Sequence, residues 1–442
     1  MTRRNRLAAS TQAPGMAGSV LWRYAAIGAQ FFIVTGVTHY SPIAIAGRYF
    51  GIYGFVSVAF TIVGFGVPDG AVRRIPKLRL TDDRRVMRTV NTTVSFSVLA
   101  TLLIVPIMVP SLHILFGLSQ EVGWLSAAWW VGYCIVFLCG QLITALDKPV
   151  TGTFVAYSLI NFACLPTQLM YVAITPRVDL TGLLLSGVAG TAIAVVLSIW
   201  TLERTCWHLL KQHALSWHWQ RRHRHELASL LKGGFPMMVS RFLQAAIPWI
   251  PTWTLLIVGE SAAAAKYGAA SRLAVAATSL IAAIRFTVRP RLVTLYETKH
   301  YDEISTLSRR LSVICMIPPI LAACVLEISG RSLITTIFGP SYATSALIVE
   351  VLMLAVAAEA IGGVSDEILK MSGRTRIVLI SMAIGMFIEI VAAVSLRHAG
   401  PVAEALAVVL AFGIEYCIQV VWLSRRTPIV IYPLLAGPKA SV

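Results

Sequence analysis

The chain has 442 residues, of which 57% are hydrophobic and only 13% are charged. Soluble domains carry about 25% charged residues, and a soluble protein of this composition would expose large apolar patches. The net charge of +17 does not indicate a nucleic-acid partner, because the Lys and Arg residues lie in short segments between apolar runs. The composition therefore excludes an ordinary soluble protein and predicts a multi-pass membrane protein.

Apolar runs of about 20 residues, the length that crosses a bilayer core, recur along the whole chain. Backbone groups in lipid must be hydrogen-bonded internally, so each run predicts a helix. The predicted fold class is all-α integral membrane, with about 12 transmembrane helices. The predicted spans are 18–40, 52–72, 90–112, 122–146, 152–175, 180–203, 233–257, 264–288, 310–329, 344–368, 375–396 and 402–424.

The Lys and Arg residues concentrate on alternate segments between the spans, and cytoplasmic loops are the ones enriched in these residues. This bias places both termini in the cytoplasm and requires an even number of spans. The segments predicted to be cytoplasmic are 1–17, 73–88, Lys148, 204–232, 289–310, 370–376 and 425–442. The opposite side holds Arg48, Arg177, Lys266, Arg331 and Arg397.

The longest hydrophilic stretch, 204–232, interleaves five His and three Trp with basic residues. A metal site and an amphipathic helix on the cytoplasmic leaflet both account for this pattern, and the basic and aromatic composition favours the helix. We therefore predict no metal site and interpret 204–232 as a linker. It separates an N-terminal six-helix bundle (18–203) from a C-terminal one (233–424), and the tails are 1–17 and 425–442.

The two predicted bundles share short patterns. Tyr53-Gly54 opens the second span, and Tyr267-Gly268 opens the eighth. Basic segments close the same two spans, at 73–77 and 289–291. Six spans followed by six spans of the same orientation form a parallel repeat, an arrangement typical of transporters with a substrate site between the halves.

Within the hairpin 233–292, three arginines lie inside the apolar spans 233–257 and 264–288, and two helix-bending prolines lie late in the first of these spans. A charge in hydrocarbon costs several kcal/mol, so such residues usually face a bundle interior or a wet cavity. The hairpin therefore predicts a cationic cavity inside the membrane bundle. The residues are Arg241, Arg272, Arg285, Pro248 and Pro251.

Three sequence elements carry a resemblance to a known family. They are Phe235-Pro236 followed by the stretch 265–273 (AKYGAASRL), the stretch 47–54 (GRYFGIYG) and the stretch 337–342 (IFGPSY). With these elements in their chain order and with twelve spans, the chain resembles the polysaccharide-transporter branch of the multidrug/oligosaccharidyl-lipid/polysaccharide exporter superfamily. This branch comprises O-antigen and exopolysaccharide flippases. Many of these relatives carry an acidic residue late in the seventh span, where this chain has Pro251-Thr252-Trp253.

The resemblance implies a flippase that moves a polyprenyl-pyrophosphate-linked oligosaccharide across the inner membrane for cell-surface polysaccharide synthesis. It implies alternating access by two six-helix bundles around a V-shaped central cavity, with ion coupling. The expected partners are the lipid-linked oligosaccharide, membrane lipid, and the polysaccharide polymerase and glycosyltransferases of the same process.

The intramembrane arginines are candidates for substrate binding. Arg23, about one turn into the first span, either binds pyrophosphate bidentately or snorkels to the headgroups. Arg241 shares a polar helix face with Gln244 at i+3, which favours a role in the cavity. Arg272 either faces the substrate or pairs with a carboxylate on a neighbouring helix. Arg285 lies close to the cytoplasmic end, and we expect it to snorkel.

Intramembrane carboxylates are candidates for proton or sodium coupling, because a buried carboxyl can carry a proton. The alternative for each is a structural ion pair with one of the arginines. The candidates are Glu359, Glu389 and Glu415, in the tenth, eleventh and twelfth spans. Asp69, at the end of the second span, is expected to pair with Arg73.

Signatures of catalysis are missing from the sequence. It contains no P-loop, no H-E-x-x-H and no G-x-S-x-G, so we predict no enzyme and no cofactor. The seven cysteines are scattered without C-x-x-C spacing and are interpreted as packing residues. Two alternative functions remain: a drug or metabolite cation antiporter of the same superfamily, and a membrane-embedded glycan polymerase or ligase.

Overall fold

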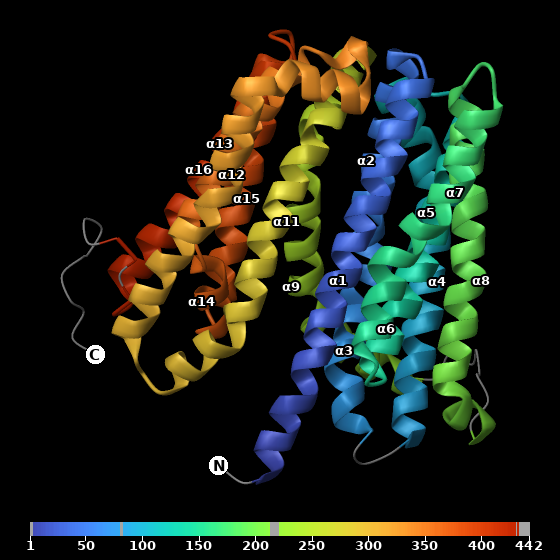
Figure 1. Ribbon diagram of the computed structural model, residues 1–442. Coiled ribbons are helices and arrows are strands. Elements are labelled where there is room, and N and C mark those ends of the chain that lie inside the picture. The colour runs from blue at the N-terminus through green and yellow to red at the C-terminus, as the bar shows by residue number, and fades with distance from the viewer. Residues whose placement is uncertain (1–2, 80–82, 213–220, 430, 433–442) are drawn as a thin grey trace. The chain divides into compact units, whose positions relative to one another are not determined.

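The computed structural model describes residues 3–79, 83–212, 221–429 and 431–432. Every regular element in these ranges is helical (Figure 1). The chain divides into two units, Met1–Ala245 and Ala246–Val442. The predicted central cavity and the six-plus-six division of the spans stay predictions, and part of the 204–232 linker lies outside the described residues.

Ten of the twelve predicted spans correspond to helices long and apolar enough to cross a membrane, among the residues described. The all-α membrane fold class is therefore confirmed. The two other predicted spans are helical but are not among these ten. The span 18–40 lies within α1 (Arg3–Tyr40), and the span 233–257 is divided among α9 (Arg221–Ala246), η3 (Ile247–Trp249) and α10 (Ile250–Ile257).

The N-terminal unit is built around α5, which packs against α3, α4 and α8 (Figure 1). A second contact layer is formed by α7, which packs against α8 and α1. Besides α1 and α9, the elements are α2 (Ile43–Ala59), η1 (Phe60–Gly66), α3 (Val67–Leu78), α4 (Asp83–Phe116), α5 (Gln120–Ala145), α6 (Pro149–Thr153), the π-helical turn η2 (Phe154–Ser158), α7 (Leu159–Ile174) and α8 (Leu180–Gln212).

The C-terminal unit is built around α16, which packs against α10, α11, α13, α14 and α15. Buried carboxylates on several of these helices therefore come close to one another. Besides η3 and α10, the elements are α11 (Ser261–Glu297), α12 (Tyr301–Phe338), η4 (Pro340–Tyr342), α13 (Ser345–Gly362), α14 (Ser365–Met371), α15 (Thr375–Leu396) and α16 (Pro401–Arg426).

The predicted span 52–72 is interrupted, where a continuous helix was expected. Gly64, Phe65 and Gly66 all have positive φ, at 57°, 49° and 86°. Left-handed backbone is costly for residues with a Cβ but not for glycine. Glycine at two of the three positions therefore lowers the conformational energy of the break. Pro68, in the first turn of α3, has no backbone N–H to leave unpaired there. Two helices therefore replace one, and α3 starts a new N-terminus beside α9.

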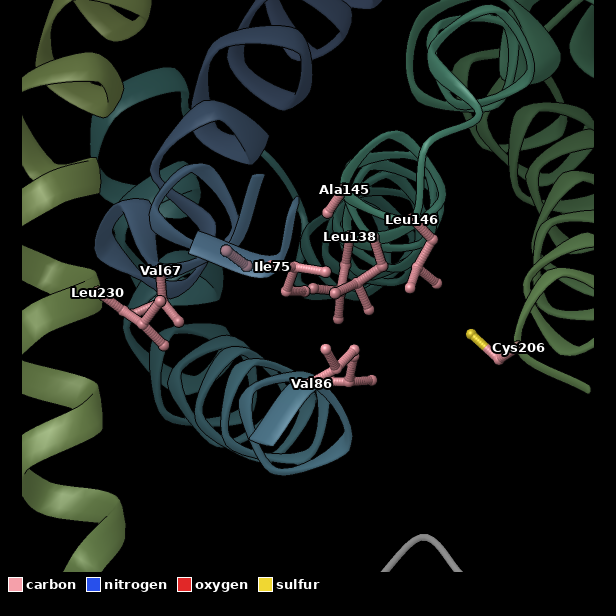
Figure 2. Close-up of a cluster of buried hydrophobic side chains, with 11 residues drawn as sticks. Val67, Ile75, Val86, Leu138, Ala145, Leu146, Cys206 and Leu230 are labelled. Carbon is pink, nitrogen blue, oxygen red and sulfur yellow. The ribbon is translucent and has the colours of Figure 1, made fainter. Parts of the chain in front are cut away.

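A cluster of buried side chains joins α3 to its neighbours (Figure 2). Between lipid-embedded helices such contacts act mainly through van der Waals packing, because lipid tails are as apolar as the side chains. The cluster draws on α3, α4, α5, α8 and α9, and thereby fixes the position of the half-helix α3. Its members are Val67, Ala71, Ile75, Val86, Val90, Leu138, Leu142, Ala145, Leu146, Cys206 and Leu230.

Candidate functional site

The first candidate site lies in the N-terminal unit, where α9 crosses the start of α3. Arg241 of α9 forms an ion pair with Asp69, which is buried in the first turn of α3. The expected pair of Asp69 with Arg73 is wrong. Arg73 instead donates a hydrogen bond to the backbone oxygen of Gly233 at 3.4 Å, and acts on Asp69 only electrostatically. Asp69 therefore links two helices and does not mark a span boundary.

Glycines set the close approach of α9 to α3. A Cβ placed on Gly234 would overlap the backbone of Gly66 and Gly70, and a Cβ on Gly70 would overlap the backbone of Leu230. Small residues allow such backbone contact between membrane helices. Arg241 follows Gly234 by two helical turns, and its side chain reaches Asp69. Motif reasoning missed this arrangement, although Gly66, Gly70 and Gly234 were visible in the sequence.

Arg23 and Arg241 are connected through two aromatic rings in the same unit. The Arg23 guanidinium lies 4.9 Å from the ring centroid of Tyr157, and the Arg241 guanidinium lies 4.6 Å from that of Phe137. The two rings are edge-to-face with centroids 6.0 Å apart. We call Arg23, Tyr157, Phe137 and Arg241 the cation–aromatic row. Gln244, predicted beside Arg241, is exposed on α9.

The π-helical turn η2 positions one end of this row. Tyr157 lies in η2, and the adjacent Ser158 hydroxyl donates to the backbone oxygen of Trp22 at 2.9 Å. This bond ties η2 to α1 one residue before Arg23. π-helical turns of this kind are frequent at functional sites. Here the turn places the Tyr157 ring beside the exposed Arg23.

The second candidate site is a buried polar network in the C-terminal unit. Arg285 of α11 pairs with the carboxylate of Glu359 at 3.0 Å and donates to the backbone oxygen of Glu359 at 2.7 Å. Its guanidinium also lies 3.9 Å from Asp366, which in turn pairs with Lys370 at 3.0 Å. The prediction that Arg285 snorkels is wrong, because its side chain is buried among acidic partners. For Glu359, the structure forms the ion pair that was its alternative.

Glu415 is connected to this network through the side chain of Gln419 and two serine hydroxyls. The Gln419 side-chain amide donates to Glu415 at 3.2 Å and to the Ser381 hydroxyl at 3.0 Å. The Ser365 hydroxyl donates to the Gln419 carbonyl oxygen at 3.2 Å. Glu415 itself is 3% exposed. No ion pair to Glu415 occurs among the described residues, whereas Glu359 and Asp366 both have cationic partners.

The third candidate site is a pair of carboxyl groups in the same unit. Glu389 of α15 and Glu404 of α16 are both completely buried. None of their four carboxyl oxygens, nor the buried hydroxyl of Tyr267, has a hydrogen-bond partner within the described ranges. Tyr267 lies within electrostatic reach of both carboxyls and of Arg272. Glu404 was not among the predicted residues, although it was visible as a carboxylate inside the predicted span 402–424.

Arg272 joins this third site from α11. It is buried, and its guanidinium stacks over the ring of Trp249 at 4.1 Å. It also donates to the hydroxyl of Ser271 at 3.2 Å. The three predicted arginines and the predicted amide are divided between the units. Arg23, Arg241 and Gln244 lie in the N-terminal unit, and Arg272 lies in the C-terminal unit with all three predicted carboxylates.

No family profile and no curated protein matches the sequence. Among solved structures, the chain is similar to the lipid II flippase MurJ in an inward closed conformation, with a TM-score of 0.69 and 12% identity over 92% of this chain and 87% of that one. It is also similar to a multidrug resistance MATE family transporter of the MOP superfamily in an inward-facing conformation, with a TM-score of 0.63 and 13% identity over 91% and 97%.

A variant of the Vibrio cholerae MATE transporter VcmN matches with a TM-score of 0.57 and 14% identity, over 94% of this chain and 96% of that one. At these identities the likeness concerns the fold. The chain has the fold of MOP superfamily transporters, and together with its ten apolar helices this identifies a multi-pass membrane protein.

Proposed function

We propose that the protein is a flippase that moves a polyprenyl-pyrophosphate-linked oligosaccharide across the inner membrane by alternating access. The cation–aromatic row carries this proposal. Guanidinium groups bind phosphate oxygens through paired, charge-assisted hydrogen bonds. The faces of aromatic rings carry partial negative charge and stack against the C–H faces of sugars. Two arginines joined by two rings therefore suit a ligand that combines pyrophosphate with sugar residues.

The fold supports the same proposal, because its neighbours include a lipid II flippase. Glycosyltransferases would supply the lipid-linked oligosaccharide, and a polysaccharide polymerase would consume it. Both termini would face the cytoplasm, since basic residues concentrate on that side of the predicted topology.

The C-terminal unit would supply the ion coupling. The network around Arg285 holds three carboxyls against two cations, Arg285 and Lys370. An unpaired buried charge is costly, so one of the carboxyls should be protonated, and Glu415 is the one for which the described residues supply no ion pair. Glu389 and Glu404 add a second pair that cannot both stay ionised in a buried site. Protons that these groups gain on one side and release on the other would drive the cycle.

The experiment is transport of a labelled polyprenyl-pyrophosphate oligosaccharide into proteoliposomes. Arg23→Ala and Arg241→Ala should each reduce the rate by about tenfold to a hundredfold, the range expected when a hydrogen bond to a charged group is lost. Arg177→Ala is the matched control, because Arg177 is an exposed arginine of the same unit outside the row. Full activity in both row variants would contradict the proposal.

A second candidate function is the antiport of organic cations. The buried Glu389–Glu404 pair with Tyr267 offers carboxyl and aromatic groups that suit such a ligand, and the MATE neighbours are multidrug transporters. In this case transport of a fluorescent organic cation would be lost in Glu389→Gln and Glu404→Gln, while Arg23→Ala would retain it.

A further inference from the structure

We propose that Asp69 is an internal competitor for the anion that binds Arg241, so that substrate binding and release proceed by exchange of one anionic partner for another. This inference rests on the proposed function and concerns how the arginine is regulated. The structure supplies the starting state of the exchange, in which Arg241 is neutralised by Asp69.

The ion pair with Asp69 engages only one of the two terminal nitrogens of the Arg241 guanidinium, which together form a two-pronged donor fork. The Nη2 nitrogen contacts Asp69, whereas the buried Nη1 nitrogen has no hydrogen-bond partner among the residues that the structure describes. A guanidinium binds phosphate best with two parallel N–H donors. An incoming phosphate group can bind Nη1 once this buried nitrogen is uncovered, and it gains the full fork only when Asp69 leaves Nη2.

Asp69 lies at the start of α3, beside the break in the second predicted span. It is the third residue of α3, directly after the helix break at 64–66. Broken helices form the substrate and ion sites of many transporters. α9 contacts the break through Gly234 and Gly66, with no side chain of either residue between the backbones. Because the buried cluster and the hydrogen bond from Arg74 to Ser229 join α3 to α9, the exchange requires only the Asp69 side chain to turn away from Arg241.

The charges of the two competing anions favour replacement of Asp69 by pyrophosphate at Arg241. A pyrophosphate diester carries an ionised oxygen on each phosphorus, whereas Asp69 offers a single negative charge. The dianion therefore attracts Arg241 more strongly, and nearby Arg73, which acts on Asp69, adds to this attraction. After release, Asp69 can pair with Arg241 again. This avoids leaving a half-buried cation without a partner, which would be costly.

The consequence is a separation of binding from turnover. Without its carboxylate, residue 69 cannot compete, so the anion should bind more tightly but leave more slowly. Asp69→Asn should bind inorganic pyrophosphate about tenfold more tightly than the wild type, because the competing ion pair is gone. In the proteoliposome assay the same variant should show a lower KM and a lower maximal rate.

Binding is measured by isothermal titration of the full-length protein in nanodiscs with inorganic pyrophosphate. Arg241→Gln should abolish the binding that Asp69→Asn strengthens. Asp147→Asn is the charge-matched control, since Asp147 is an exposed carboxylate of the same unit, and it should bind as the wild type does. Asp69→Ser provides a second neutral side chain in case the asparagine variant does not fold.

Unchanged or weaker pyrophosphate binding in a folded neutral variant of Asp69 would overturn the inference, as would binding that persists in Arg241→Gln. Tighter binding in the neutral variant without any transport of lipid-linked oligosaccharide by the wild type would leave the exchange standing and refute the proposed function. The two claims can therefore fail separately.

Discussion

At the scale of single residues, the position of Arg285 is decided by its partners and not by its distance from the end of a span. Its guanidinium contacts Glu359 twice, lies near Asp366, and stacks 5.5 Å from the Tyr416 ring. A charge with several partners gains more from them than from reaching the headgroups. The neighbouring Glu415 accepts a hydrogen bond from the Gln419 amide and has no ion pair among the described residues.

This difference predicts unequal effects of the same chemical change. Glu359→Gln should lower the free energy of unfolding by about 3–5 kcal/mol, because it leaves Arg285 buried with weakened compensation. Glu415→Gln should change it by less than about 1 kcal/mol, since an amide resembles a protonated carboxyl and keeps the Gln419 contact. Thermal unfolding in detergent measures both, and equal losses in the two variants would show that Glu415 is ionised.

Asp179, between α7 and α8, makes stability depend on pH. The Tyr171 hydroxyl and the backbone N–H of Gly182 donate hydrogen bonds to its carboxylate, and they hold the pKa of Asp179 below its usual range. A lowered folded-state pKa stabilises the fold above the unfolded-state pKa, and this contribution is lost as the pH falls through the folded-state value.

Asp179 also caps the N-terminus of α8, a contribution of about 1 kcal/mol. Asp179→Ala should therefore lower the melting temperature near neutral pH, and the difference from the wild type should shrink in acid. Melting curves of both proteins across this pH range provide the measurement. A difference that stays constant with pH would mean that the carboxylate charge makes no contribution.

At the scale of elements, the contact between α9 and α3 depends on backbone packing with glycine on both helices. Gly234 and Gly233 are adjacent in α9 but face different surroundings. A Cβ on Gly234 would meet the backbone of α3, whereas a Cβ on Gly233 meets nothing within 4 Å. The helix therefore needs glycine at one of these two positions only.

Alanine at these two positions gives a matched comparison. Gly234→Ala should destabilise the protein by about 1–3 kcal/mol, the usual cost of overpacking, and should weaken the Asp69–Arg241 pair. Gly233→Ala should be neutral or slightly stabilising, because alanine favours helix over glycine. Thermal unfolding of both variants, with pyrophosphate binding as a second readout, measures the difference. Equal effects would argue against a close α9–α3 contact.

At the scale of the whole molecule, the spans could be predicted and the ion pairs could not. Ten spans follow from apolar length alone, because a bilayer demands about 20 such residues per helix. The prolines at 248 and 251 correctly indicated a helix disturbance, seen as η3. The break at 64–66 was missed, because a Gly-Phe-Gly stretch is compatible with either helix or left-handed backbone.

The candidate sites were predicted as residue types and not as pairs. Arg23 and Arg241 were recognised because charges in apolar runs are rare. Their connection through Tyr157 and Phe137 depends on how four separate elements pack, and sequence spacing does not encode this. For the same reason Asp69 was assigned to its neighbour Arg73, although its partner lies far along the chain in α9.

The central claim is that the protein carries a lipid-linked oligosaccharide, and substrate choice by the wild-type protein tests it most directly. Proteoliposomes would be offered a labelled polyprenyl-pyrophosphate oligosaccharide and, separately, a fluorescent organic cation, each with and without a proton gradient. We predict that the oligosaccharide crosses, faster with the gradient, and that the cation does not. Export of the cation with no movement of the oligosaccharide would contradict the account.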